Sequence, residues 1–447
     1  MEVLSSEDNS RLENFQRARE RAHDAYRNNF TNDFDTLNTD EQIEYFKRRG
    51  ITFERYSEDK AKTFMLESTY FFKLKILSTN FTTDPATNTF TNLDFAQLRD
   101  VSILDYHLRS LINYLSSNIE HALRVRFNRV LEHFDDDSDE ATRPYIEYRS
   151  HGNPRYDVSR DLSRSIYTSN LIEQYDFAQM KPIWLLWEAG DFSTLITSYR
   201  AYIRSKKLSD IIDILFNPTR KIRNAAAHHN SVLVPTRQNS IVNAIVYLAN
   251  ILIPWNEHTE SAHLQRADIV RTIIQDQMVS QFAALLLVHV NLVTSTAVRQ
   301  SAIREVKDFL SRLEYHWDWY TNENSSCPQL THKLTAVKTL LESFCSFMEA
   351  LDDDVLNEDE QLLLLPPTDK AETAEVLLYM EECFVEDVSN DIHKLNEMDK
   401  ESAGKPQLID NADTDSIEEK TEHLSNEEML AQIMQQINDM KENEERA

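Results

Sequence analysis

The longest run of helical periodicity in the chain extends from Leu104 to Phe134. Apolar side chains recur there every three or four positions, at Leu104, Leu108, Leu111, Ile112, Leu115, Ile119, Ala122, Leu123 and Phe127. Charged side chains occupy another face, at Arg109, Glu120, Arg124, Arg126 and Arg129. This spacing predicts one long helix with an apolar stripe on one face and charged side chains on the opposite face.

Shorter periodic segments predict further helices on both sides of this one. On the N-terminal side, Asn38 or Thr39 caps a helix that Gly50 ends, and a second helix covers 57–66. A charged helical arm is expected within the first 34 residues. The other predicted helices lie at 178–189, 193–205, 208–216, 238–252, 262–298, 300–320 and 329–350.

Two places are expected to interrupt this helical pattern. Pro218 follows Asn217 and is expected to separate the helix at 208–216 from a short helix that begins near Thr219, because proline lacks the backbone N–H of a helix interior. Residues 143–165 are basic and are expected to be irregular.

Glycine is scarce, and this narrows the fold class. Only 4 of the 447 residues are glycine, and they lie far apart in the sequence. Phosphate-binding loops of the dinucleotide-binding and P-loop types need glycines a few residues apart, so both are excluded. Tight-turned all-β folds also use more glycine than this. Together with the periodicity, the composition predicts an all-α fold.

The net charge of −28 is concentrated at the C-terminal end. Residues 351–447 contain 29 acidic and 7 basic residues, whereas the segment 143–237 contains 14 basic and 9 acidic residues. We expect 351–447 to be an acidic, partly disordered tail that ends in an amphipathic helix from Ser425. Three roles stay open for it: keeping the protein in solution, packing as ordinary helix, or competing with a polyanion for the basic segment.

Neither the cysteines nor the uncharged segments indicate export or membrane insertion. The 3 cysteines form no C-x-x-C pair, so we expect neither a disulfide framework nor a zinc site. We therefore expect a cytoplasmic location. The longest uncharged window, 277–298, contains Gln281, His289 and Asn291, which favours a buried helix over a membrane span.

The segment TRKIRNAAAHHN, residues 219–230, combines side chains that suit RNA cleavage. A histidine can take the proton of a ribose 2′-hydroxyl or protonate the leaving 5′-oxygen, and a guanidinium can hold the phosphate. The alternative is structural: two histidines cap the carbonyls of a helix end, and the basic side chains face solvent. No carboxylate or His/Cys cluster indicates a metal or another cofactor.

On a helix these side chains do not all share one face. Arg220, Asn224 and His228 are four residues apart and lie together, whereas Arg223 lies about 140° round from His228. We expect Asn230 to be the left-handed residue that ends the helix, with both histidines in its last turn.

The segment resembles the R-N-x-x-x-H motif of HEPN ribonucleases, and its doubled histidine resembles the Abi-like abortive-infection family of bacteria (AbiD and AbiF types). Other segments resemble that family in the same order: LNTDEQIEYFKRRGI, STYFFKLK, the long helix with Asp105, Arg109, Glu120 and Arg124 at the expected places, and MKPIWLLWEAGDFSTL. The resemblance covers about residues 35–250. Ala226 stands where that family commonly has cysteine.

The resemblance implies a HEPN-type helical bundle and a role for each motif residue. Arg223 would hold the scissile phosphate, Asn224 would orient His228, and His228 would be the acid or base. His229 is either a second acid or base or a structural partner. A composite site formed by two motif helices would make the protein a homodimer.

Further residues are expected to support this site. Glu120 and Arg124 either support catalysis or form a simple intrahelical ion pair. We expect Arg220, Lys221 and Arg126 to contact RNA.

The chain is thus expected to be a HEPN endoribonuclease toxin of a bacterial anti-phage abortive-infection system. It would cleave RNA by metal-independent transesterification, and a non-coding RNA antitoxin is an implied partner. Two alternatives stay open: a HEPN dimer that holds a structured RNA without cutting it, and a helical scaffold that senses a phage protein. The expected organisation is an arm at 1–34, the Abi-like HEPN domain at 35–255, a helical extension at 256–350 and the tail at 351–447.

Overall fold

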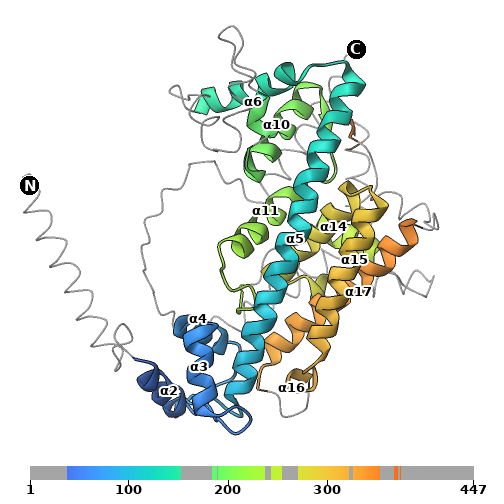
Figure 1. The fold of residues 1–447 in the computed structure, drawn as a ribbon. Coiled ribbons are helices and arrows are strands. Elements are labelled where there is room, and N and C mark those ends of the chain that lie inside the picture. The colour runs from blue at the N-terminus through green and yellow to red at the C-terminus, as the bar shows by residue number, and fades with distance from the viewer. Residues whose placement is uncertain are drawn as a thin grey trace, which may run out of the picture. The chain divides into compact units, whose positions relative to one another are not determined.

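The computed structural model describes residues 38–152, 184–188, 190–236, 243–253, 270–321, 326–352, 367–370 and 373 (Figure 1). Its elements in these ranges are helices, apart from one sheet in which β1 (Leu208–Ser209) pairs antiparallel with β2 (Thr368–Asp369). The predicted all-α fold class is therefore confirmed. The chain forms two compact units: 1–102 with 322–327, and 103–321 with 328–447.

The first unit contains α2 (Thr39–Arg48), α3 (Glu58–Glu67), α4 (Phe71–Ser78) and the beginning of α5 (Phe95–Phe134). The side chains and backbones of Asn38 and Glu41 form a capping box that starts α2. Gly50 follows the helix with a φ of 82°, which only glycine adopts without strain. Both ends of this helix are as predicted.

The second unit is organised around α14 (Gln277–Leu292), in which every residue from Phe282 to Leu292 is buried. α14 packs against α11 (Asp213–Ala227), α12 (Asn243–Leu252) and α17 (Pro328–Asp352). A helix that is apolar on all sides is stable only when it is surrounded by others. The buried helix expected within 277–298 is thus confirmed, and no helix in the described ranges is both long and apolar enough to cross a membrane.

The remaining helices of this unit lie around that centre. α10 (Phe192–Ser205) packs against α6 (Ser138–Gly152) and α9 (Leu185–Glu188), and α15 (Thr296–Glu314) packs against α17. The short α16 (Asp318–Thr321) also contacts α17. The rest of α5 belongs to this unit, and all nine apolar residues of its predicted stripe are buried.

Three predicted interruptions and boundaries are wrong. Pro218 does not break the chain but lies inside α11, because the buried face of Leu215, Phe216 and Ile222 runs continuously past it. Burial of that face stabilises the helix by more than the roughly 3 kcal/mol that an interior proline costs it. Residues 143–152 are helical as part of α6. The helix expected over 262–298 is not continuous: residues 270–273 are helical, a turn follows, and α14 begins at Gln277, where Asp276 caps it through the backbone N–H groups of residues 278 and 279, and ends at Leu292.

The division into units does not follow the domain boundaries expected from the sequence. It falls within α5, after Ser102, and it places the helices of 270–352 in the same unit as the motif helix α11. The boundary expected at 255, the N-terminal arm and nearly all of the acidic tail lie outside the described residues.

Candidate functional site

The motif segment 219–230 forms the last turns of α11 and the turn that follows it. His228 is the C-cap residue, and its backbone N–H donates to the carbonyl oxygen of Asn224 at 2.9 Å. His229 has a φ of 58°, and Asn230 N–H donates back to the Ala225 carbonyl at 2.9 Å. This is a Schellman ending with His229 in the left-handed position.

The ending corrects one expectation from the sequence. His229, not Asn230, is the left-handed residue, so the two histidines do not share the last helical turn. A left-handed histidine is uncommon but several-fold enriched over most other residues. Its conformation rotates the second histidine away from the helical position that the spacing suggests. Both side chains are exposed, and no described residue forms a hydrogen bond with the His228 ring.

Arg223 is held by a residue of the long helix α5. Its Nε and Nη2 donate to Oε1 of Glu120 at 3.0 and 2.7 Å, and its Nη1 donates to Oδ1 of Asn224 at 3.3 Å. The two side chains of the ion pair are only 28% and 19% exposed. A guanidinium has five N–H donors, so these contacts leave two for another ligand. The Asn224 side chain thus orients Arg223 here rather than His228.

His229 is held by a second charged residue of α5. Arg109 Nη1 lies 3.1 Å from His229 Nδ1, and Arg109 Nε donates to Asp105 Oδ2 at 3.0 Å. Because a guanidinium only donates hydrogen bonds, Nδ1 of His229 must accept, and the proton of its neutral ring is on Nε2. Asp105 is fully buried, and its Oδ1 accepts the backbone N–H groups of Val232 and Leu233 at 2.7 and 3.1 Å.

The chain beyond the histidines is fixed by a buried lysine of α17. Lys333 Nζ donates to the carbonyl of Val234 and lies 3.1 Å from Oδ2 of Asp276. Burial lowers the pKa of Lys333, and the charge of Asp276 acts in the opposite direction. Asp276 also accepts from the Thr236 hydroxyl at 2.7 Å. The turn after α11 is therefore anchored by Asp105 on one side and by Lys333 on the other.

Glu120 and Arg124 do not form the simple intrahelical ion pair that their spacing allows. The Glu120 carboxylate faces Arg223, whereas Arg124 donates to the carbonyls of Glu188 and Gly190 at 2.8 and 3.0 Å. Arg124 thus ties α5 to the turn between α9 and α10. A Cβ at Gly190 would lie 1.9 Å from the Leu186 carbonyl oxygen, so this turn requires glycine.

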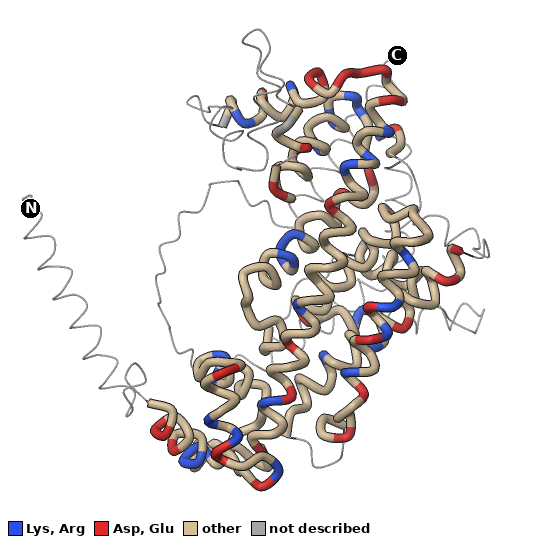
Figure 2. Tube along the Cα trace, viewed as in Figure 1, with Lys and Arg blue, Asp and Glu red and all other residues tan. Residues whose placement is uncertain are grey.

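The residues expected to contact RNA divide into two groups. Lys221 is exposed on α11, and Arg220 donates to the Ser193 hydroxyl at 2.8 Å; Figure 2 shows this basic turn within α11 in blue. Arg126 is not on that surface. Its guanidinium is 15% exposed and donates to Asp210 Oδ2 at 2.9 Å, and Tyr199 donates to the same oxygen. Arg126 is therefore part of an interior ion pair, because Asp210 is itself buried.

The family resemblance includes Asp105 and Arg109 but gave neither a role, and sequence reasoning did not single out Lys333. One signal was present: Asp105 lies between Leu104 and Leu108, within the apolar stripe, and a carboxylate in such a position needs buried partners. Lys333 gave no comparable signal, since its partner segment lies nearly 100 residues away. Across the described ranges, no group of three or more His, Cys, Asp or Glu side chains is placed to hold a metal ion.

Comparison with known proteins bears on the region that carries this site. Residues 61–233 match the family model described as Abi-like protein. No curated protein and no solved structure matches the chain significantly. The matched region contains all of α5 and α11, and with them Asp105, Glu120, Arg223 and both histidines. Residues 61–233 of this chain belong to the Abi-like protein family.

Proposed function

We propose that this protein is a HEPN-type, metal-independent endoribonuclease that acts in bacterial abortive infection. One observation carries the proposal: at the end of α11, Arg223 keeps two N–H donors available while the exposed His228 ring is unbound among the described residues. An anion-binding group and an acid–base group thus lie on one short segment of the Abi-like region.

The chemistry follows from these two side chains. One histidine takes the proton from a ribose 2′-hydroxyl, and the 2′-oxygen attacks the adjacent phosphorus. The bond to the 5′-oxygen breaks, and the protonated histidine returns a proton to that oxygen. The products are a 2′,3′-cyclic phosphate and a 5′-hydroxyl. Arg223 stabilises the charge that develops on the phosphate oxygens.

Glu120 and Arg109 act as positioning residues in this proposal. Glu120 binds the Nε edge of Arg223 and so directs the remaining donors toward a phosphate. Arg109 holds His229 in the tautomer that carries its proton on Nε2, which suits a supporting donor rather than a base. We therefore assign the base to His228.

The site is proposed to be shared between two chains. Arg223 and His228 lie about 140° apart around one helix, which prevents one chain from aiming both at the same phosphate. A homodimer that brings two α11 ends together supplies Arg223 from one chain and His228 from the other. His228, once it has taken the proton of the 2′-hydroxyl, returns that proton to the leaving 5′-oxygen.

Cleavage of labelled RNA by the purified protein in EDTA tests the activity. We expect the unchanged protein to cut, and we expect Arg223→Ala and His228→Ala to reduce the rate by about 10³-fold or more. His332→Ala, which removes an exposed histidine of α17, is the matched control and retains full activity. Far-UV circular dichroism verifies that each variant is folded. A fully active His228→Ala protein overturns the assignment.

The same experiment separates the alternatives. RNA that is bound without cleavage, with binding lost in Arg223→Ala, indicates an RNA-holding dimer. Absence of both cleavage and binding indicates a scaffold. Mixing Arg223→Ala chains with His228→Ala chains then tests the shared site: mixed dimers contain one complete site, so activity returns to about a quarter of the original level.

In the cell, the activity is proposed to act as a growth-arresting toxin in the cytoplasm, held silent by an RNA antitoxin before infection. Expression of the unchanged chain is expected to arrest growth. Arg223→Ala and His228→Ala are expected to abolish that arrest at equal protein level, and toxicity that survives both substitutions contradicts the role.

A further inference from the structure

An exposed aromatic ring lies beside the histidines of the candidate site. Tyr106 of α5 is 58% exposed, although it directly follows the fully buried Asp105. Its ring centre lies 5.9 Å from the guanidinium carbon of Arg109, and Arg109 Nη1 lies 3.1 Å from Nδ1 of His229. Arg109 therefore connects the tyrosine ring to the exposed histidine that follows α11.

The same face of α5 continues from Tyr106 to Glu120, the residue that binds Arg223. At 100° per residue, positions 110, 113, 117 and 120 all lie within about 40° of Tyr106 around the helix axis. Three small polar side chains lie between the two ends and none of them is buried: Ser110, Asn113 and Ser117. We call these five positions the 106–120 face. It is about 21 Å long, a length that several nucleotides of an extended strand cover.

The end of α11 and the turn after it run along α5 in the opposite direction (Figure 1). The contact of Arg109 with His229 and that of Glu120 with Arg223 fix this direction. A strand that places one phosphate at Arg223 and continues past the histidines therefore reaches Tyr106.

The charge around this face suits a polyanion. Residues 105–124 and 219–234 contain five Lys or Arg and two acidic residues. Both acidic residues are engaged, since Asp105 accepts from Arg109 and Glu120 accepts from Arg223. No unpaired carboxylate of these two segments thus repels a phosphate.

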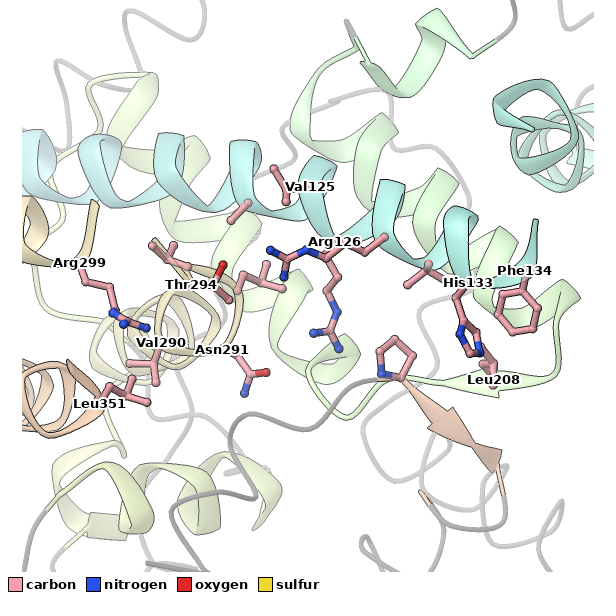
Figure 3. A pocket seen from close by; sticks show the side chains of 16 residues that line it. Val125, Arg126, His133, Phe134, Leu208, Val290, Asn291, Thr294, Arg299 and Leu351 are labelled. Atoms are coloured by element: carbon pink, nitrogen blue, oxygen red, sulfur yellow. The ribbon is translucent and has the colours of Figure 1, made fainter. Parts of the chain in front are cut away.

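The opposite face of α5 has different surroundings. It borders a cavity of about 550 Å³ that is lined by residues 122–134 of α5 and by none of the 106–120 face (Figure 3). Two of the three arginines described in that lining are neutralised, Arg126 by Asp210 and Arg299 by Asp352. The surface that joins an exposed aromatic ring to the candidate site is therefore the 106–120 face.

We propose that the 106–120 face binds single-stranded RNA and that Tyr106 stacks on one of its bases. An aromatic side chain stacks on the face of an unpaired base, whereas a duplex keeps these faces stacked inside its own helix. Every base has such a face, so the ring contributes affinity with little preference for sequence. The inference rests on the proposed function in taking RNA as the ligand. It adds a substrate class: RNA that is unpaired over several nucleotides beside the cleaved bond.

RNA binding by the full chain with His228→Ala, which prevents cleavage, tests the proposal. Fluorescence anisotropy compares a short RNA of mixed sequence that forms no hairpin with an abasic oligomer that has the same number of phosphates. Tyr106→Ala is expected to weaken binding of the RNA about tenfold, because one base loses its stacking partner. Its affinity for the abasic oligomer and the salt dependence of binding are expected to stay the same, since the ring carries no charge.

Two further variants serve as controls. Tyr106→Phe keeps the ring and is expected to bind RNA as tightly as the unchanged side chain. Tyr148→Ala is the matched control, because Tyr148 is 55% exposed and lies on α6, beyond the far end of α5. Circular dichroism verifies folding, and light scattering measures the mass. Unchanged RNA affinity in Tyr106→Ala overturns the proposal, as does an equal loss for both oligomers. A change from dimer to monomer also overturns it, because it assigns the ring to a contact between chains.

The cleavage assay distinguishes failure of this inference from failure of the proposed function. RNA binding that depends on Tyr106, in a protein that never cleaves RNA, supports the inference and contradicts the nuclease activity. Cleavage by the unchanged protein, together with full RNA affinity in Tyr106→Ala, contradicts the inference alone. Absence of binding to both oligomers overturns the inference as well.

Discussion

Asp105→Asn is the substitution that tests most directly how the end of α11 is held. Asp105 is fully buried; its Oδ2 accepts from Arg109, and its Oδ1 accepts the backbone N–H groups of Val232 and Leu233. Asparagine retains the shape and one carbonyl oxygen, so the two backbone contacts survive. The amide NH₂ then faces Arg109 Nε, which places two donors against each other.

The expected loss follows from the burial of both partners. Arg109 is also buried, with a side chain 7% exposed, so the substitution leaves an uncompensated charge in the interior. Breaking a buried ion pair by removing one partner costs about 3–5 kcal/mol. Replacing both partners costs less, so the double variant Asp105→Asn, Arg109→Leu is expected to be more stable than Asp105→Asn alone by about 2 kcal/mol.

Urea unfolding followed by circular dichroism and tryptophan fluorescence measures both differences. The RNA cleavage rate is expected to fall with Asp105→Asn, since the turn that carries His229 loses its fixed support. A destabilisation below about 1 kcal/mol, or a double variant as unstable as the sum of the single ones, refutes the reasoning.

Three further predictions concern other parts of the molecule. Glu120→Gln keeps an acceptor for Arg223 but removes the negative charge, so the affinity for RNA at low salt is expected to rise. The slope of log affinity against log salt concentration is expected to steepen by up to about one counterion. Filter binding over a salt series measures both, and an unchanged slope counts against the ion pair between Glu120 and Arg223. The two side-chain polar atoms of Asn291 are buried and have no hydrogen-bond partner among the described residues, so Asn291→Leu is expected to raise the free energy of unfolding by about 1–3 kcal/mol, and a melting temperature lower than that of the unchanged protein contradicts this reasoning. Burial lowers the pKa of His289 from 6.5 to about 3, so between these values only the unfolded chain binds the proton, and acidification favours unfolding. From pH 7 to pH 5 the unchanged protein is expected to lose about 2 kcal/mol more than His289→Leu in urea titrations, and equal losses in the two proteins refute the neutral buried histidine.

Local signals in the sequence were sufficient for much of the helical structure. The capping box at Asn38 and the glycine at residue 50 act within one turn of α2, so their effect is readable from neighbouring residues. The apolar stripe of α5 recurs over about six turns, which leaves no other element compatible with it. Both predictions are confirmed because the interactions that decide them are close in sequence.

Pro218 shows where such local rules fail. Proline in the sixth position of a helix is a strong local signal against continuity. The opposing term comes from burial of Leu215, Phe216 and Ile222 in a unit where α11 packs against α14, a helix more than 50 residues away in sequence. No pattern within α11 reveals that neighbour. The end of the helix was misplaced by one residue for a similar reason, since Arg109 and Asp105 fix the turn from a distant helix.

The partner of Glu120 illustrates the same limit at the candidate site. Arg124 is four residues away and Arg223 is 103 residues away, and both are arginines. Spacing alone favours Arg124, but that side chain is occupied by the carbonyls of Glu188 and Gly190. The choice between two identical side chains depends on tertiary packing. The sequence singled out Glu120, Arg124 and Arg223, whereas which of them pair required the structure.

The matched Abi-like region does not contain everything that holds its own motif. The region ends at residue 233, one residue before the carbonyl that Lys333 binds, and the apolar face of α11 is covered by α14. Lys333 is 3% exposed, and Asp276 links it to Thr236 of the same turn. A chain that stopped at 233 would expose Leu215, Phe216 and Ile222 and would leave the turn after His229 anchored only by Asp105. The geometry of Arg223 and His228 therefore depends on the whole second unit, and helices α14 and α17, beyond the matched region, help to position these two residues.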